Sequence, residues 1–297
     1  MRNLKLRQLT IAIISIIVLL LAGCMPTAEK KEDKLTVYTT LYPLTFFAQE
    51  IGGANADVKN LIPPHADPHE FELSPRDLTK LTQADLFIYN GAGLEVWIKR
   101  TESSLAKESK VKLLDSSAKI NELNQNDPHI WLDPLLGIKQ VEQITEAFCK
   151  LDAKHADYYN KNSAALIQKL LKLDQDFKEA FSFKHKPFVV AHAAFGYLAT
   201  RYHLEQLAVY GLTTTHEASL KELLHLKKRI QQDQIRYLFF DGTARPKVAE
   251  ELRCEMGATA LELSSLEKLT VKERAQGDDY FKIMYRNLRR LKQAVKD

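Results

Sequence analysis

Short runs of β-forming residues alternate with amphipathic stretches through most of this chain, and the alternation occurs twice, on either side of a long helical passage. Strands that alternate with helices are typical of strand–helix–strand units and of a parallel sheet. The expected strands are 35–41, 58–62, 84–89 and 111–114 in the first half and 188–191, 204–209, 237–240 and 258–263 in the second. The sequence therefore predicts an α/β fold with two lobes, each with a four-stranded, mainly parallel sheet flanked by helices.

Helical patterns fill the spaces between these strands. One helix is expected to begin at Pro75, with Ser74 as its cap and Asp77 near its positive end. The closing residues place apolar side chains at helical spacing, a stripe that we expect to dock on a sheet rather than to bind a membrane. The other expected helices are 43–51, 94–106, 195–201, 220–231 and 244–254.

The long helical passage covers 135–181, with a break expected near Asp152. Within it, apolar residues recur at steps of three, four or seven, which keeps one apolar stripe along a helix. No hinge rich in glycine, proline or serine separates the two halves. A helix of about 25 residues would span roughly 38 Å, so we predict a rigid backbone helix in the connector 138–183, between an N-terminal lobe at 35–137 and a C-terminal lobe at 184–297.

The first 23 residues have the features of an export signal. A basic start leads into the apolar run 11–21, which is too short to span a bilayer comfortably and ends in small residues. The segment LAGC resembles the bacterial lipobox, in which signal peptidase cuts before Cys24 and the thiol is diacylated. The alternatives are an ordinary signal peptide or an anchoring helix with an incidental cysteine. With 24–34 as a polar tether, we expect an extracytoplasmic protein anchored to the cytoplasmic membrane as a lipoprotein.

Charge and cysteine content narrow the classes further. Three of the 42 basic residues lie in the leader, which has no acidic residue, and the chain has 38 acidic residues. The rest of the chain is therefore nearly neutral, and no nucleic-acid partner is indicated. Lipidation of Cys24 would leave Cys149 and Cys254, which either form a disulfide or remain two buried free thiols. Neither has CxxC spacing, so thiolate zinc sites are disfavoured.

The loop 64–75, PHADPHEFELSP, holds two histidines, three carboxylates and three prolines, and proline restricts its own φ and the residue before it. We interpret His69 as the first ligand of a buried transition-metal site. Ligands of open α/β sheets bind beyond the carboxyl ends of the strands. His129, His192 and Glu267 also lie at or after predicted strand ends, so all four residues can face one interlobe cleft, two from each lobe.

Rival ligands remain at this point. Asp241 also lies at a strand end, and position alone does not separate it from Glu267. His65 and His216 lie in loops near the expected cleft and are weaker candidates. The remaining histidines are expected to be surface residues, namely His155, His185, His203 and His225.

Several segments together resemble the cluster A-I, or TroA-like, solute-binding lipoproteins of bacterial metal ABC transporters. They are ADPHEFELSP with ADLFIYNGAGLEVW, DPHIWLDP, FVVAHAAFGYLATRY, YLFFDGTARPKVAEEL and SSLEKLT followed by DDYFKIMYRNLRRLK. The resemblance implies two α/β lobes, a backbone helix between them and one metal in the cleft. It matches the first three ligands of the family to His69, His129 and His192. The segment SLEKLT resembles LESLT of the zinc-binding branch, which places the fourth ligand on Glu267.

The ligand types favour zinc. Three imidazoles and one carboxylate make a tetrahedral set that suits Zn(II), whereas Mn(II) prefers more oxygen donors. Manganese-selective relatives carry a carboxylate in place of the third histidine, so His192 argues for zinc. Two features depart from the family pattern: the histidine-rich loop of many zinc members is missing before Asp127, and Asp241 stands where glutamate is common.

Three further residues near the motifs are candidates for supporting roles. Glu72, Asp133 and Trp131 fit roles in orienting the histidines or walling the site. Surface or packing roles are the alternative for each of them.

The resemblance implies a monomeric, lipid-anchored receptor that captures zinc and delivers it to an ABC permease, with no catalysis. One alternative is an exported zinc hydrolase with Glu267 or Asp241 as general base, which the absence of HExxH and GxSxG motifs disfavours. Others are a manganese-selective member of the same family and an adhesin.

Overall fold

The computed structural model describes residues 34–64, 66–124, 127–183, 185–212, 219–242 and 244–296, without the side chains of residues 104 and 106–108. The predicted leader, Cys24 with most of its tether, His65 and His216 all lie outside the described residues. Within the described part of the chain, no helix has the length and apolar character needed to cross a membrane.

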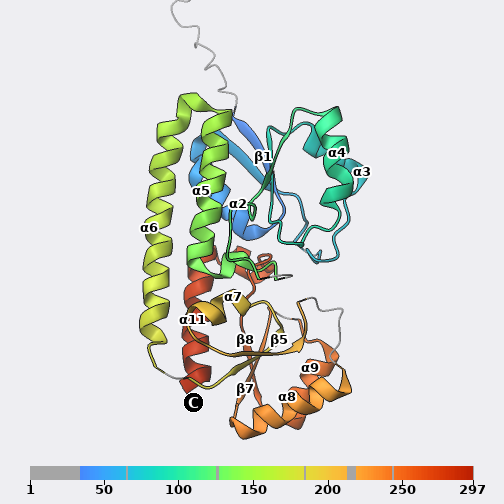
Figure 1. The fold of residues 1–297 in the computed structure, drawn as a ribbon, viewed down its shortest axis with the longest axis vertical. Helices are drawn as coiled ribbons and strands as arrows, with labels where there is room; N and C mark the ends of the chain where they lie inside the picture. Colours follow the sequence, from blue (N-terminus) through green and yellow to red (C-terminus); the bar gives the residue numbers. More distant parts are fainter. Residues whose placement is uncertain are drawn as a thin grey trace, which may run out of the picture. The chain divides into compact units, whose positions relative to one another are not determined.

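The described residues form two four-stranded sheets, and every strand pair in them is parallel. The strand order is β2-β1-β3-β4 in the first sheet and β6-β5-β7-β8 in the second (Figure 1). The strands are β1 (Leu35–Thr39), β2 (Ala56–Asn60), β3 (Leu86–Tyr89), β4 (Lys112–Asp115), β5 (Phe188–His192), β6 (Gln206–Tyr210), β7 (Tyr237–Phe240) and β8 (Thr259–Glu262). The predicted fold class is confirmed.

Strand β3, in the interior of the first sheet, is apolar at every position. Its four residues are all buried. Leu86 and Ile88 pack into the large core that includes α2, whereas Phe87 and Tyr89 pack into a smaller core with Trp97. Successive side chains of a strand point to opposite faces, so a strand with helices on both faces needs apolar residues at every position.

The helices follow the predicted pattern with small shifts at their ends. Helix α3 begins at Pro75 with a capping box, in which Ser74 Oγ accepts from Asp77 N and the Asp77 side chain accepts from Ser74 N. The α-helices are α2 (Tyr42–Gly52), α3 (Pro75–Thr82), α4 (Ile98–Glu108), α5 (Pro134–Leu151), α6 (Ala156–Ala180), α7 (Gly196–Arg201), α8 (Leu220–Gln232), α9 (Lys247–Glu255), α10 (Val271–Ala275) and α11 (Tyr280–Lys296). Short 3-10 turns are η1 (Gly53–Asn55), η2 (Ile130–Leu132) and η3 (Ala153–His155).

The long helical passage is a hairpin of two helices. The expected break at Asp152 is present: α5 ends there, η3 follows, and α6 runs back beside α5 (Figure 1). Helix α6 has 25 residues and is therefore about 38 Å long. Its buried stripe runs from Tyr159 to Phe177, as the sequence predicts.

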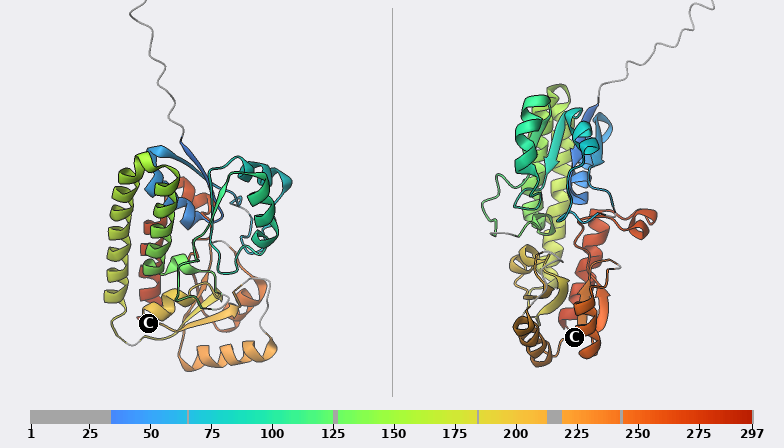
Figure 2. Two further views of the ribbon diagram at one scale, coloured as in Figure 1. Left: turned by 45° about the horizontal axis from the view of Figure 1, so that its top comes forward. Right: turned by 90° about the vertical axis from the view of Figure 1, so that its right-hand side faces the viewer.

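One continuous core joins the two sheets. The largest cluster of buried apolar residues contains Val37 of β1, Leu170 of α6, Val190 of β5 and Leu291 of α11. Helix α6 runs beside α5 along one half of its length and beside α11 along the other (Figure 1, and the left view of Figure 2). The apolar stripe of α11 packs against this core, as expected, and residues 34–297 form one compact unit. The residues after the strand ends of both sheets are therefore held on a shared frame.

Candidate metal centre

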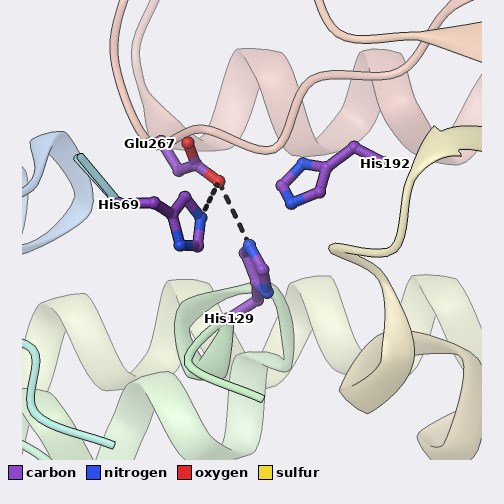
Figure 3. Close-up of side chains that lie close together, drawn as sticks. All are labelled: His69, His129, His192 and Glu267. Carbon is purple, nitrogen blue, oxygen red and sulfur yellow. Dashed lines mark hydrogen bonds and ion pairs between the residues drawn. The ribbon is translucent and has the colours of Figure 1, made fainter. Parts of the chain in front are cut away.

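The structure brings together the four residues that the sequence and the resemblance single out. His69 lies in the loop after β2, His129 directly before η2, His192 at the end of β5 and Glu267 in the loop after β8. One ligand atom from each lies within 4.8 Å of the others (Figure 3). The first two come from the first lobe and the last two from the second.

Glu267 connects two of the histidines. Its Oε1 lies 3.1 Å from His129 Nε2 and 3.4 Å from His69 Nε2. The ring of His192 has its centroid 5.0 Å from that of His129, but its Nε2 donates to Leu212 O at 2.8 Å. With that proton on Nε2, the lone pair of the neutral His192 ring is on Nδ1. Three of the four candidate ligands, Glu267, His129 and His69, are thus hydrogen-bonded together. The fourth, His192, is held beside them by a backbone carbonyl.

The cluster is withdrawn from solvent, which makes its electrostatics strong. His129 is fully buried, and Glu267 is 8% exposed. Burial alone would lower the pKa of His129, but hydrogen bonds with Asp127 and Glu267 outweigh it and raise the pKa to about 9. Burial would raise the pKa of Glu267, but the histidines hold it well below its usual value. For His192, burial lowers the pKa. In the metal-free site, a proton on His129 therefore balances the Glu267 carboxylate.

Both ligand loops of the first lobe use the same Asp-Pro-His motif. Asp67 Oδ1 accepts from His69 N at 2.9 Å, and Asp127 Oδ1 accepts from His129 N at 3.0 Å. In each motif the aspartate side chain thus accepts from the backbone N–H two residues further along, which is an Asx-turn. This turn fixes the backbone at each histidine. Asp127 Oδ1 also lies 2.8 Å from His129 Nδ1, so it holds the proton on Nδ1 and directs Nε2 to the cluster. The sequence reasoning missed this role of Asp127, although the repeated motif is visible in the sequence.

Comparison with known proteins shows the family of the chain. The family model described as "Zinc-uptake complex component A periplasmic" matches residues 37–294. The chain belongs to this family. It is 35% identical over 300 residues to the "High-affinity zinc uptake system protein ZnuA" of Bacillus subtilis, which covers 93% of this chain and 94% of that protein.

Two streptococcal relatives extend the comparison. The "Zinc-binding lipoprotein AdcA" of Streptococcus pneumoniae is 32% identical over 309 residues, covering 98% of this chain and 61% of that protein. The structure of its Zn(II)-bound ZnuA-like domain aligns with a TM-score of 0.79 at 35% identity, over 89% of this chain and all of that domain. The laminin-binding protein Lmb of Streptococcus agalactiae, described as having adhesin and metal-transporting activity, aligns with a TM-score of 0.79 at 29% identity, over 88% of this chain and 99% of that one.

Trp131 lies against His129 and links two loops of the cluster. It is buried, and its ring centroid lies 5.4 Å from that of His129. Its Nε1 donates to Ser265 O at 2.7 Å, and its own carbonyl accepts from Tyr280 Oη at 2.6 Å. The loop that carries His129 is therefore tied to the loop that carries Glu267.

Asp241 lies outside the cluster. Both of its carboxylate oxygens are engaged by Ser265, through the backbone N at 3.2 Å and through the hydroxyl. Burial and the nearby Glu267 raise the pKa of Asp241 to about 7. Asp241 therefore shapes the loop before Glu267, and the structure brings Glu267 to the histidines, in agreement with the zinc-branch pattern.

The two other supporting candidates have different positions. Asp133 caps α5 by accepting from Leu135 N at 2.9 Å and pairs with Arg201 Nε at 2.5 Å, so it joins the lobes structurally. Glu72 is exposed on the loop before α3, where it lines a surface hollow with Trp97. Asp133 and Glu72 are near candidate ligands in the sequence, but the side chain of Asp133 points to α5 and Arg201, and that of Glu72 is exposed.

Among the described residues, the other histidines and the cysteines take no part in the cluster. His203 and His225 are exposed as expected, whereas His155 and His185 are partly buried. Cys149 and Cys254 are unpaired, and the expectation of two buried thiols is wrong, because Cys149 is only partly buried and Cys254 is exposed.

Replacing Asp127 with asparagine is expected to weaken zinc binding about 10- to 100-fold, the usual effect of losing the outer partner of a metal-bound histidine. An asparagine Oδ1 still accepts from His129 N, but it lacks the negative charge that holds the proton on Nδ1. Competition against a chromophoric chelator measures the change. Asp67→Asn is the matched control, because among the described residues the Asp67 side chain accepts only from the backbone N–H of His69. Equal losses in both variants would contradict the role given to Asp127.

Proposed function

We propose that this chain captures Zn(II) outside the cytoplasmic membrane and delivers it to an ABC permease, as a substrate-binding component and not as an enzyme. The observation that carries the proposal is the cluster of three imidazoles and one carboxylate, with ligand atoms within 4.8 Å of one another. Zinc is the cargo in this proposal. His69, His129, His192 and Glu267 would hold it.

The donor set supports zinc over manganese and capture over hydrolysis. Four protein donors complete a tetrahedral Zn(II) site and leave no position for an activated water, whereas catalytic zinc sites keep one open. Glu267 lies between His69 and His129 at hydrogen-bond distances, the place of a ligand rather than of a base behind a water. Mn(II) favours more oxygen donors than this cluster offers.

The leader sequence and the family support a membrane anchor and a permease partner for this protein. We propose that cleavage before Cys24 and diacylation attach a monomer to the outer face of the cytoplasmic membrane. The lipobox-like LAGC segment supports this, as does the description of the pneumococcal relative as a lipoprotein. The family description as the periplasmic component of a zinc-uptake complex supports a permease partner.

Metal titration of a form lacking residues 1–24 tests the proposal, since residues 34–297 form a compact unit on their own. Native mass spectrometry is expected to find one zinc per chain. In competition, Mn(II) is expected not to displace Zn(II) at equal concentration. Stoichiometry other than one, or a preference for Mn(II), would overturn the assignment of zinc as cargo. Hydrolysis of a substrate that depends on the bound zinc would favour the alternative function, an exported zinc hydrolase.

A further inference from the structure

The segment NGAGLEVW after β3 supplies none of the four candidate ligands, yet it contacts the loop that carries His129. Asn90 is fully buried, and its Nδ2 donates to Pro128 O at 2.8 Å. Pro128 directly precedes His129 and has no backbone N–H, so its carbonyl is its one backbone polar group. That carbonyl also accepts from Ile130 N at 2.8 Å. Asn90 therefore holds the ligand loop at the peptide that leads into His129.

The Asn90 side chain is itself oriented from the far side. Gln140 on α5 is fully buried, and its Nε2 donates to Asn90 Oδ1 at 3.2 Å and to Ser116 Oγ at 3.0 Å. Because the oxygen of the Asn90 amide faces Gln140, its nitrogen faces Pro128. An amide fixed in this way acts as a donor toward the ligand loop and as an acceptor toward the helix.

Glu95 fixes the backbone of the same loop. The carboxylate is 3% exposed and accepts from Asn90 N at 2.8 Å, from Gly91 N at 3.0 Å and from Thr40 Oγ1 at 2.5 Å. No cation is among these partners, so three donors satisfy a buried acid that would otherwise be costly. Glu95 ties the end of β1 to the turn after β3.

Glycine is required in this turn. Gly91 has φ of 75°, and a Cβ there would lie 2.0 Å from Asp115 Oδ1. Gly93 has φ of 87°, which glycine adopts without the penalty of other residues. The glycines of the motif thus allow the close turn that presents Asn90 and receives Glu95.

We propose that Asn90 is a positioning residue for the metal centre, fixing His129 through Pro128 while Gln140 and Glu95 fix Asn90. The inference rests on the proposed zinc capture and deepens it. Asp127 sets which nitrogen of His129 carries the proton, and Asn90 sets where the peptide before His129 lies. Zinc binds imidazole at about 2.0–2.1 Å, so a displaced His129 would bind the metal more weakly. The network would therefore act on affinity as well as on folding.

The test uses Asn90→Asp, which keeps the shape but places a carboxylate oxygen against Pro128 O. Zinc affinity is expected to fall at least about 10-fold. The visible absorption of the Co(II)-loaded protein is expected to weaken, because tetrahedral Co(II) absorbs more strongly than Co(II) of higher coordination. Asn162→Asp is the matched control: Asn162 Nδ2 donates to Ile51 O at 3.0 Å, between α6 and the end of α2. This control is expected to lose thermal stability while keeping wild-type zinc affinity and Co(II) spectrum.

Glu95→Gln is the second variant, for the case in which Asn90→Asp does not fold. Glutamine offers one acceptor oxygen where Glu95 offers two, so the turn loses a hydrogen bond to Asn90 or Gly91 while its shape is kept. We expect a smaller loss of affinity with the same spectral change. Wild-type affinity and spectrum in a folded Asn90 or Glu95 variant would overturn the inference, as would equal effects in the control. Failure of the wild-type protein to bind zinc would instead overturn the proposed function.

Discussion

Replacing His129 with alanine is expected to weaken zinc binding about 100- to 1,000-fold. Apparent binding free energies of structural zinc sites are about 10–16 kcal/mol, so one ligand of four accounts for roughly 2.5–4 kcal/mol, and each 1.4 kcal/mol is about tenfold in affinity. His129 is fully buried and bonded to Glu267. Chelator competition measures the affinity.

The control for this variant is His225→Ala on the exposed side of α8. It removes an imidazole without touching the cluster and is expected to leave zinc affinity unchanged. Circular dichroism of both metal-free variants separates lost binding from lost folding. A folded His129→Ala protein that binds zinc within tenfold of wild type would remove His129 from the ligand set.

Zinc affinity is expected to rise about tenfold per pH unit from pH 6.5 towards pH 9. The pKa of His129 is raised to about 9 in the metal-free protein, so below that pH zinc must displace its proton. The stability of the metal-free protein should change in the opposite direction. The stabilisation of the metal-free fold by protonated His129 is complete below the ordinary pKa of 6.5. This stabilisation is lost as pH rises through about 9, the pKa of His129 in the folded protein. The contribution of Glu267, whose pKa is lowered, is present above its usual value of 4.5 and is lost as pH falls.

Calorimetric titrations across this pH range, with a metal buffer, measure the first effect, and thermal melts of the metal-free protein measure the second. Asp127→Asn weakens the hydrogen bond that supports the His129 proton, so this variant is expected to show a shallower rise of zinc affinity with pH. An affinity independent of pH between 6.5 and 8.5 would contradict the protonated state assigned to His129.

Local sequence signals were enough for the fold and for much of the site. The apolar residues of β3 and the cap of α3 are set by the chain near them, since burial and hydrogen bonding there follow from neighbouring residues. His192 could be placed because it ends a strand, and strand ends of a parallel sheet meet at one edge. The break at Asp152 was also visible. The hairpin that it produces was not predicted, because the packing of α6 on α5 depends on side chains far apart in the sequence.

The rest of the site depends on contacts between loops. Strand-end position does not separate Asp241 from Glu267. Ser265 engages both carboxylate oxygens of Asp241, whereas Glu267 Oε1 lies beside two histidines. Glu72 follows a ligand by three residues, yet the backbone directs it to solvent. Asn90 donates to Pro128, which lies 38 residues further along the chain, and a local sequence pattern cannot predict a contact at that separation.

The continuous core through α6 and α11 has a consequence for the speed of exchange. Lobes that share one packed interior resist hinge opening, a motion of microseconds to milliseconds, whereas loops move in nanoseconds to microseconds. Pro63, Pro64, Ala66 and Pro68 border a cavity of about 330 Å³ that reaches Glu267. Lys268 Nζ donates to Ala66 O at 3.2 Å. The residence time of a bound ion would then depend on how often the residues after β2 that border this cavity move away from Lys268. A rotation of the lobes by tens of degrees between metal-free and metal-bound crystals would show the opposite.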